Sequence, residues 1–302
     1  MAASLKKGCR LQKRLAEDFV TGPLKSGNMV FEGLVGYYDY ILQTGDVRTA
    51  TMPFIQSPKY VVCAVILYLL MVIFGPRIME KRQPFQLRNV LIGYNCFSVV
   101  FSVWMMWEFF ACSVLNPNFN LLCQDVIQAD TSPMTMRLVN VHWWYFFSKV
   151  IEFLDTLFFV LRKKNKQISF LHVYHHGSML ILQWSLVKYV PGGVSYFGPM
   201  LNCFIHTLMY AYYMLSAFGP HMQKYLWWKK YLTRMQMYQF VLIFLHVSNA
   251  MTHKYSPNAI PVNVFFWLHW FYMISLFWLF QHFYQNAYRA KKLEESSKSK
   301  AE

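Results

Sequence analysis

Seven long apolar stretches constrain the fold more than any other feature of this chain. They cover residues 60–74, 90–115, 141–161, 168–187, 196–218, 233–251 and 262–284. A helix rises about 1.5 Å per residue and a bilayer core is about 30 Å thick, so such stretches are typical of transmembrane helices, the first being the weakest. None alternates like a β-barrel strand, and a backbone in lipid must satisfy its own hydrogen bonds. We therefore predict an all-α integral membrane protein with seven transmembrane helices.

The charge pattern indicates how these helices are oriented. The chain is 56% hydrophobic and 14% charged, with a formal net charge of +15. Its Lys and Arg residues gather in the loops at 76–88, 162–167, 224–232 and 287–292, and such loops are cytosolic by the positive-inside rule. The N-terminus is then lumenal and the C-terminus cytosolic. No segment offers the basic solvated face that a nucleic acid needs, so we expect no nucleic-acid partner.

The chain divides into a membrane domain and two polar ends. We predict an N-terminal tail at 1–58, a seven-helix membrane domain at 59–285 and a basic cytosolic tail at 286–302. The first residues lack the apolar core of a cleavable signal peptide. The end of the chain places Lys298 and Lys300 in a dilysine-like pattern, which predicts retrieval to the endoplasmic reticulum. The six cysteines form no CxxC pair, so neither a zinc site nor a disulfide framework is indicated.

Ionisable side chains inside the predicted third helix point to a functional site. Lys149, Glu152 and Asp155 recur every three or four residues and should share one face. A charge at the centre of a membrane helix costs about 2.5–3.5 kcal/mol on insertion scales, so this face must look inward. For Lys149 and Glu152, ion pairing that holds the bundle together is nearly as good an explanation as direct chemistry.

The predicted fourth helix opens with a cluster of histidines, and the next two helices add further polar side chains. His172, His175 and His176 fall on one side of their helix, where a metal, a carboxylate or an acyl substrate would partner them. Further candidates recur at helical spacing in the fifth and sixth helices: Asn202, His206, Tyr210, Gln236 and Gln239. For the two glutamines, hydrogen bonding between helices is an equally good explanation.

Several ordered segments resemble the fatty acid elongases, the condensing enzymes of microsomal acyl-chain elongation. The segments are KVIEFLDT at 149–156, LRKK at 161–164, FLHVYHHGSM at 170–179, NCFIHTLMYAYY at 202–213, KYLWWKKYLT at 224–233 and MQMYQF at 235–240. Within that family the chain looks most like the animal enzymes that act on polyunsaturated and very-long-chain substrates. The resemblance implies six helices around a narrow acyl tunnel, with CoA entering from the cytosolic side.

The resemblance also implies an activity and roles for individual residues. The enzyme would condense a fatty acyl-CoA with malonyl-CoA to give a 3-ketoacyl-CoA, CoA and CO2, without a bound cofactor or metal. His175 would carry the acyl group as an acyl-imidazole, a step open to neutral imidazole near pH 7. The other catalytic candidates are His206, His172, His176 and Asp155, and the substrate-binding candidates are Lys149, Glu152, Asn202, Tyr210, Gln236, Gln239, Lys224, Lys229 and Lys230.

The resemblance further implies a cellular setting. We expect a multi-pass protein of the endoplasmic reticulum membrane that works with the reductases and the dehydratase of the elongation cycle, as a possible homo- or hetero-oligomer. Cys123 resembles a family cysteine that can form a disulfide, but the loop between the sixth and seventh helices offers no partner, so we predict no bridge. Two other classes compete: a membrane di-iron desaturase or hydroxylase, which would need a second histidine cluster, and a seven-helix receptor or transporter.

Overall fold

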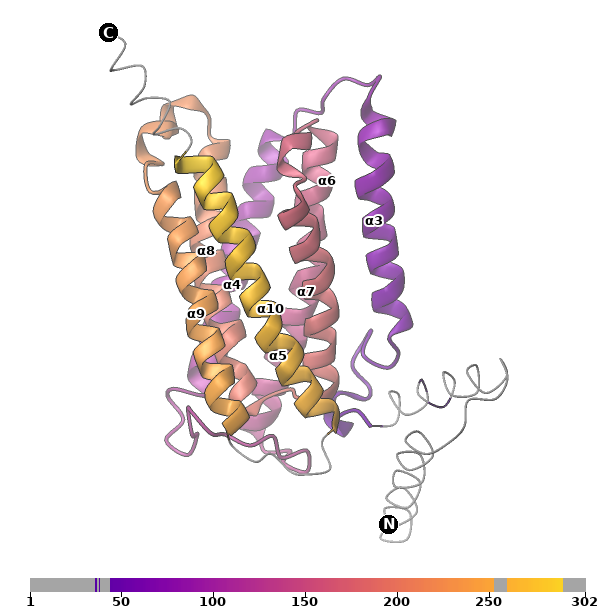
Figure 1. The fold of residues 1–302 in the computed structure, drawn as a ribbon, viewed down its shortest axis with the longest axis vertical. Coiled ribbons are helices and arrows are strands. Elements are labelled where there is room, and N and C mark those ends of the chain that lie inside the picture. The colour runs from indigo at the N-terminus through magenta and orange to yellow at the C-terminus, as the bar shows by residue number, and fades with distance from the viewer. Residues whose placement is uncertain (1–35, 37, 39–43, 253–259, 290–302) are drawn as a thin grey trace. The chain divides into compact units, whose positions relative to one another are not determined.

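The computed structural model describes residues 36, 38, 44–252 and 260–289, and these residues form helices and loops without a strand (Figure 1). The chain divides into two units, Met1–Thr44 and Gly45–Glu302, and nearly all described residues belong to the second. The α-helices of the second unit are α3 (Lys59–Met79), α4 (Arg88–Cys112), α5 (Pro133–Ile151), α6 (Phe153–Leu161), α7 (Phe170–Tyr189), α8 (Phe197–Ala217), α9 (Lys229–Thr252) and α10 (Ile260–Tyr284).

All seven predicted stretches are helical, but the third differs from its prediction in two ways. It begins at Pro133, earlier than the expected residue 141, with the proline in its first turn, where a missing N–H does no harm. It is also interrupted at Glu152, which separates α5 from α6. There the N–H of Asp155 donates to the carbonyl of Glu152, three residues back, at 3.1 Å. A short tightening of this kind inside a helix often marks a functional position.

The outer surface of the second unit is apolar. Leu67 on α3 is 66% exposed and Trp278 on α10 is also 66% exposed, and both lie on helices rich in exposed hydrophobic side chains. Among the described residues, three helices are long and apolar enough to cross a membrane by length and hydropathy alone: Lys59–Met79, Arg88–Cys112 and Val264–Tyr288. The remaining helices carry more polar residues, and several of these, such as Lys149 and His206, are buried.

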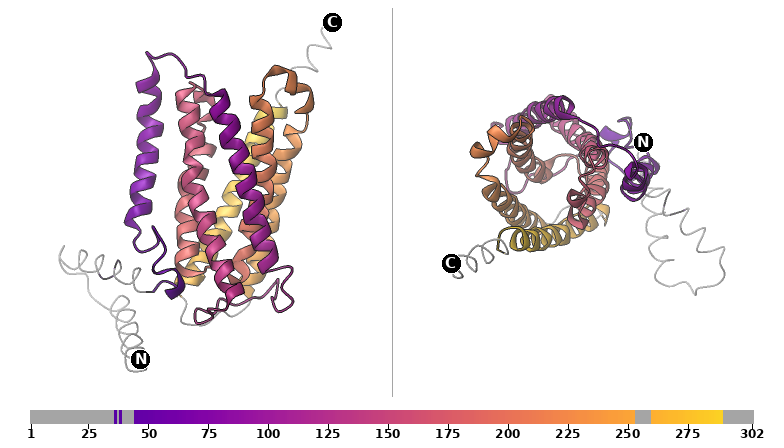
Figure 2. Two further views of the ribbon diagram at one scale, coloured as in Figure 1. Left: turned by 180° about the vertical axis from the view of Figure 1, so that it is seen from behind. Right: turned by 90° about the horizontal axis from the view of Figure 1, so that it is seen from above.

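Six helices form a closed ring. Each contacts the next in the order α4, α8, α9, α10, α7 and α5, and contacts between α5 and α4 close the ring. Helix α3 packs outside it on α6 and α7 (Figure 2). Helices α4, α5 and α8 meet through a cluster of buried side chains: Met105, Phe109, Cys112, Leu138, Val141, Tyr145, Tyr196 and Cys203. The ring encloses the polar side chains that the apolar outer surface excludes.

The two ends of the ring differ in charge. One end, which we call the basic end, carries the loops 80–87, 162–169 and 218–228 with the first turns of α4, α7 and α9. The opposite end carries the loops 113–132 and 190–196. There Arg48 forms a buried ion pair with Asp46 at 2.7 Å and donates to the carbonyls of Asp130 and Pro191. Residues 45–58, which the sequence assigns to the N-terminal tail, therefore pack on this end.

Candidate active site

A buried ion pair at the break between α5 and α6 forms the centre of the site. Lys149 Nζ donates to Glu152 Oε1 at 2.6 Å, and both side chains are almost fully buried. The same carboxylate oxygen lies 3.3 Å from Nδ1 of His206 on α8. Because a carboxylate only accepts hydrogen bonds, this contact places the proton of a neutral His206 on Nδ1 and leaves Nε2 as an acceptor.

Asn202, one turn before His206 on α8, extends this network. Its Oδ1 accepts from the hydroxyl of Tyr145 at 2.8 Å and from Lys149 Nζ at 3.3 Å. Two donors therefore fix the side-chain amide with its oxygen toward α5, so its NH2 group faces elsewhere and is able to donate. Lys149 Nζ also lies 4.4 Å from the centre of the Tyr145 ring, which adds a cation–π contact to the buried charge.

Asp155, one turn beyond Glu152, has its own partner. The hydroxyl of Tyr210 donates to Asp155 Oδ2 at 2.9 Å, and Tyr210 is buried on α8. The Tyr210 ring packs edge-on against that of His206, with 5.7 Å between centroids. Asp155 is thus joined to the central network through α8 and makes no recorded hydrogen bond with a histidine among the described residues.

His172 and His176 lie on the side of α7 that faces α3 and α6. The hydroxyl of Ser169 caps α7 by accepting from the N–H of His172, which fixes that histidine in the first turn. Its Nε2 lies 2.7 Å from the hydroxyl of Thr156, and its ring lies 4.3 Å from that of His176. His176 in turn faces the ring of Tyr68 on α3, at 6.5 Å.

His175 completes the histidine cluster of α7. Its ring lies edge-on to that of His176 at 5.2 Å, and both histidines interact electrostatically with Glu152 and Lys149. The three imidazoles therefore form one contiguous cluster on α7, in which His176 contacts both His172 and His175.

The remaining predicted site residues lie apart from this cluster. Gln239 is buried on α9, and Gln236 points at the sulfur of Met209, with its Nε2 3.9 Å away. Lys224, Lys229 and Lys230 are exposed at the basic end, where Lys224 and Lys230 lie over the rings of the adjacent tyrosines. These lysines belong to the surface of the basic end and not to the buried network.

The structure adds residues that sequence reasoning did not assign to the site. Tyr145 lies four residues before Lys149, so helical spacing could have placed it on the same face. Tyr68 bonds to Thr156 at 3.4 Å, but it lies on α3, whose apolar sequence gives no sign of this contact. A pocket of about 240 Å3 also reaches Glu152 and Tyr210 from between α4 and α5, lined in part by Ser98 and Ser148.

The described residues provide no candidate metal site. Within 44–252 and 260–289 no group of three His, Cys, Asp or Glu side chains is arranged to hold a metal ion. In the same ranges Cys63, Cys96, Cys112 and Cys203 are free thiols, and the absence of a bridge from Cys123 stays a prediction. Cys9 lies outside the described residues.

Known proteins resemble this chain over most of its length. The model of the ELO family, described as the GNS1/SUR4 family, matches residues 53–296. The chain belongs to the ELO family. A very long chain fatty acid elongase of Aedes aegypti is 43% identical over 90% of this chain and 75% of its own. The very long chain fatty acid elongase 4 of Mus musculus is 41% identical over 91% of this chain and 86% of its own. The very long chain fatty acid elongase 5 of Rattus norvegicus is 46% identical over 84% and 83%.

Family membership confirms three expectations from the sequence. The resemblance to animal fatty acid elongases is correct, and the enzyme class, a very-long-chain 3-oxoacyl-CoA synthase of fatty acid elongation, follows from the family. As a member of the ELO family, the chain is a multi-pass membrane protein. The all-α prediction is also correct for the described residues.

Proposed function

We propose that this ELO-family enzyme condenses a long-chain or polyunsaturated fatty acyl-CoA with malonyl-CoA, giving a 3-ketoacyl-CoA, CoA and CO2. One observation carries the proposal. His206 from α8 lies 3.3 Å from the carboxylate of Glu152, and His175 and His176 from α7 interact with that carboxylate electrostatically, inside a ring of helices whose surface is apolar. Imidazoles from two helices near one buried carboxylate suit acyl transfer, in which one nitrogen attacks and another handles a proton.

The first half-reaction is transfer of the acyl group to His175. A ring nitrogen of His175 attacks the thioester carbonyl, the C–N bond forms and the C–S bond breaks. The departing thiolate takes the imidazole proton and leaves as CoA. The acyl-imidazole keeps the reactivity of the thioester while CoA is exchanged for malonyl-CoA.

The second half-reaction forms the new carbon–carbon bond. Malonyl-CoA loses CO2, and the resulting enolate carbon attacks the acyl carbonyl while the C–N bond to His175 breaks. A proton taken up from solvent restores the neutral imidazole. His206, whose Nε2 is left free by the Glu152 contact, lies within reach to position the malonyl group.

Developing negative charge on oxygen needs donors that are already oriented. The NH2 group of Asn202 is available because its oxygen is held by Tyr145 and Lys149. His172, His176 and Gln239 are the other candidates, and Asp155 holds Tyr210 in place beside His206. Donors fixed before the reaction need not reorganise, which is the main source of such stabilisation.

The wider setting is part of the same proposal. Six helices surround an acyl tunnel, and CoA phosphates bind Lys224, Lys229 and Lys230 at the basic end, which faces the cytosol. Tails at 1–58 and 286–302 flank a membrane domain at 59–285 in the endoplasmic reticulum. No cofactor is bound. Reductases and a dehydratase complete the cycle, and the retrieval signal at Lys298 and Lys300 lies outside the described residues.

Intact-protein mass tests the covalent step. Purified enzyme is incubated with a long acyl-CoA alone, and wild type is compared with His175→Ala and with His221→Ala, an exposed histidine of the basic end. We expect an acyl adduct in wild type and in His221→Ala but none in His175→Ala. Elongation without any adduct would remove the covalent role of His175 and leave the condensation. If the protein binds iron and shows neither an adduct nor elongation, the result would favour the di-iron desaturase or hydroxylase class.

A further inference from the structure

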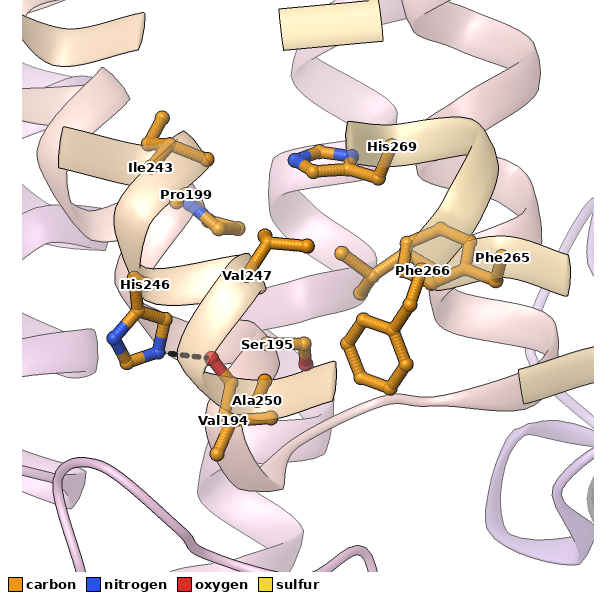
Figure 3. A pocket seen from close by; sticks show the side chains of 12 residues that line it. Val194, Ser195, Pro199, Ile243, His246, Val247, Ala250, Phe265, Phe266 and His269 are labelled. Atoms are coloured by element: carbon orange, nitrogen blue, oxygen red, sulfur yellow. Dashed lines mark hydrogen bonds between the residues drawn. The ribbon is translucent and has the colours of Figure 1, made fainter. Parts of the chain in front are cut away.

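A second pocket lies toward the opposite end of the ring from the basic end. It lies between α7, α8, α9 and α10 (Figure 3). Helix α7 and helix α8 are not neighbours in the ring, so a pocket lined by both faces the interior. Its walls are almost wholly apolar, with Leu186, Ile243, Val247, Phe265 and Phe266 among them.

One polar side chain of this pocket lacks a partner. His269 on α10 is 7% exposed, and its Nδ1 is buried without a hydrogen bond from any described residue. The second histidine of the pocket, His246, differs, because its Nε2 lies 3.1 Å from the carbonyl of Val194. Figure 3 shows His269 at the upper edge of the pocket and the His246–Val194 bond below it. Buried polar atoms in native proteins are nearly always hydrogen-bonded, so an unpaired imidazole calls for an explanation.

The pocket lies along the path of a chain that starts at His175. Leu186, on its wall, follows His175 by eleven residues on the same helix, a rise of about 16 Å at 1.5 Å per residue. Between the two, the hydroxyls of Ser178 and Tyr272 bond at 3.0 Å and hold α7 against α10. His269 lies one turn before Tyr272 on α10. An acyl chain bound at His175 and running along the interior would therefore reach His269 with its far end.

We propose that His269 is a specificity-determining residue that favours acyl chains carrying a hydroxyl at the far end over chains ending in a methyl group. This inference rests on the proposed function. A methyl group in this pocket leaves the imidazole nitrogen unpaired, whereas a terminal hydroxyl both donates and accepts and so satisfies it. The apolar walls suit the hydrocarbon body of either chain. The selectivity comes from the one polar atom at its end.

Competition between matched substrates tests this proposal. Saturated acyl-CoAs from palmitoyl to lignoceroyl, each with its ω-hydroxy counterpart, are elongated with labelled malonyl-CoA by wild type, His269→Phe and His282→Phe. His282 lies on the same helix but is exposed, so it is the matched control. We expect the ratio of kcat/KM for hydroxyl over methyl chains to be about tenfold higher in wild type and His282→Phe than in His269→Phe. The difference should appear only at lengths that reach the pocket.

The possible outcomes separate this proposal from the function on which it rests. Equal ratios in wild type and His269→Phe at every chain length would overturn the role of His269 and leave the condensing activity standing. Absence of elongation from all substrates would instead count against the proposed function. His269→Gln keeps a donor and an acceptor and should retain the preference, and His269→Leu replaces His269→Phe if the latter does not fold.

Discussion

The centre of the ring and its far pocket both bury histidines, but they treat them differently. His206 is held by Glu152, which is itself held by Lys149, and Asn202 and Tyr145 complete the network. His269 lies against apolar walls, and its Nδ1 has no hydrogen bond from the part of the chain that the structure describes. The network fixes the position and proton of each group before a substrate arrives, whereas the pocket leaves one atom to be satisfied by whatever enters. Catalysis needs groups that are fixed in advance, whereas substrate selection needs a group that only the preferred substrate satisfies.

The largest effect is expected from neutralising the carboxylate at the centre. Glu152→Gln leaves the buried charge of Lys149 without a counter-charge and weakens the hold on His206, so we expect a loss of about 3–5 kcal/mol in stability together with loss of elongation. Thermal unfolding in detergent and product formation measure the two effects. Glu108→Gln is the control, because Glu108 pairs with the exposed Arg137 and such pairs contribute about 0–1 kcal/mol. Similar losses in both variants would contradict the comparison.

A smaller effect is expected one turn away, at the hydrogen bond between Tyr210 and Asp155. Tyr210→Phe removes a donor to a buried carboxyl group, which costs about 1.5–3 kcal/mol when that group is charged. Elongation should fall, since the Tyr210 ring also packs on His206. Tyr238→Phe, on the exposed face of α9, should leave both stability and rate unchanged. An unchanged rate in Tyr210→Phe would separate Asp155 from the reaction.

Smaller still is the expected effect at the edge of the network, where Thr156 meets His172. Thr156→Val keeps the side-chain shape but removes the 2.7 Å contact, so we expect a loss of about 1 kcal/mol in thermal stability. Thr207→Val is the matched control, because the Thr207 hydroxyl donates to the carbonyl of Cys203 on its own helix and to no other described residue. If the elongation rate falls only in Thr156→Val, the orientation of His172 matters to the reaction.

Sequence periodicity predicted the helices well and the contacts between them less well. The apolar runs gave seven helical segments because lipid requires the backbone to form helices. Spacing alone put Lys149, Glu152 and Asp155 on one face, but it could not foresee the break at Glu152, after which Asp155 meets Tyr210 while Thr156 meets His172. Partners on different helices depend on which helices are neighbours in the ring, and periodicity within one helix carries no such information. The contact from Tyr68 is the clearest case, since its helix otherwise presents a mostly apolar, exposed surface.

The smallest predicted effect has the opposite sign and separates the two regions most sharply. His269→Phe removes an imidazole whose Nδ1 is buried without a hydrogen bond from any described residue, and replaces it with a ring of similar size. We expect a gain of up to about 1 kcal/mol in thermal stability, because replacing an unpaired buried polar group by an apolar one is neutral or favourable. The same substitution in the network, His206→Phe, should destabilise the protein, because it deprives Glu152 of a partner. Destabilisation by both variants would mean that His269 already has a partner in the folded protein, such as an ordered water, and that the two regions differ less than their contacts indicate.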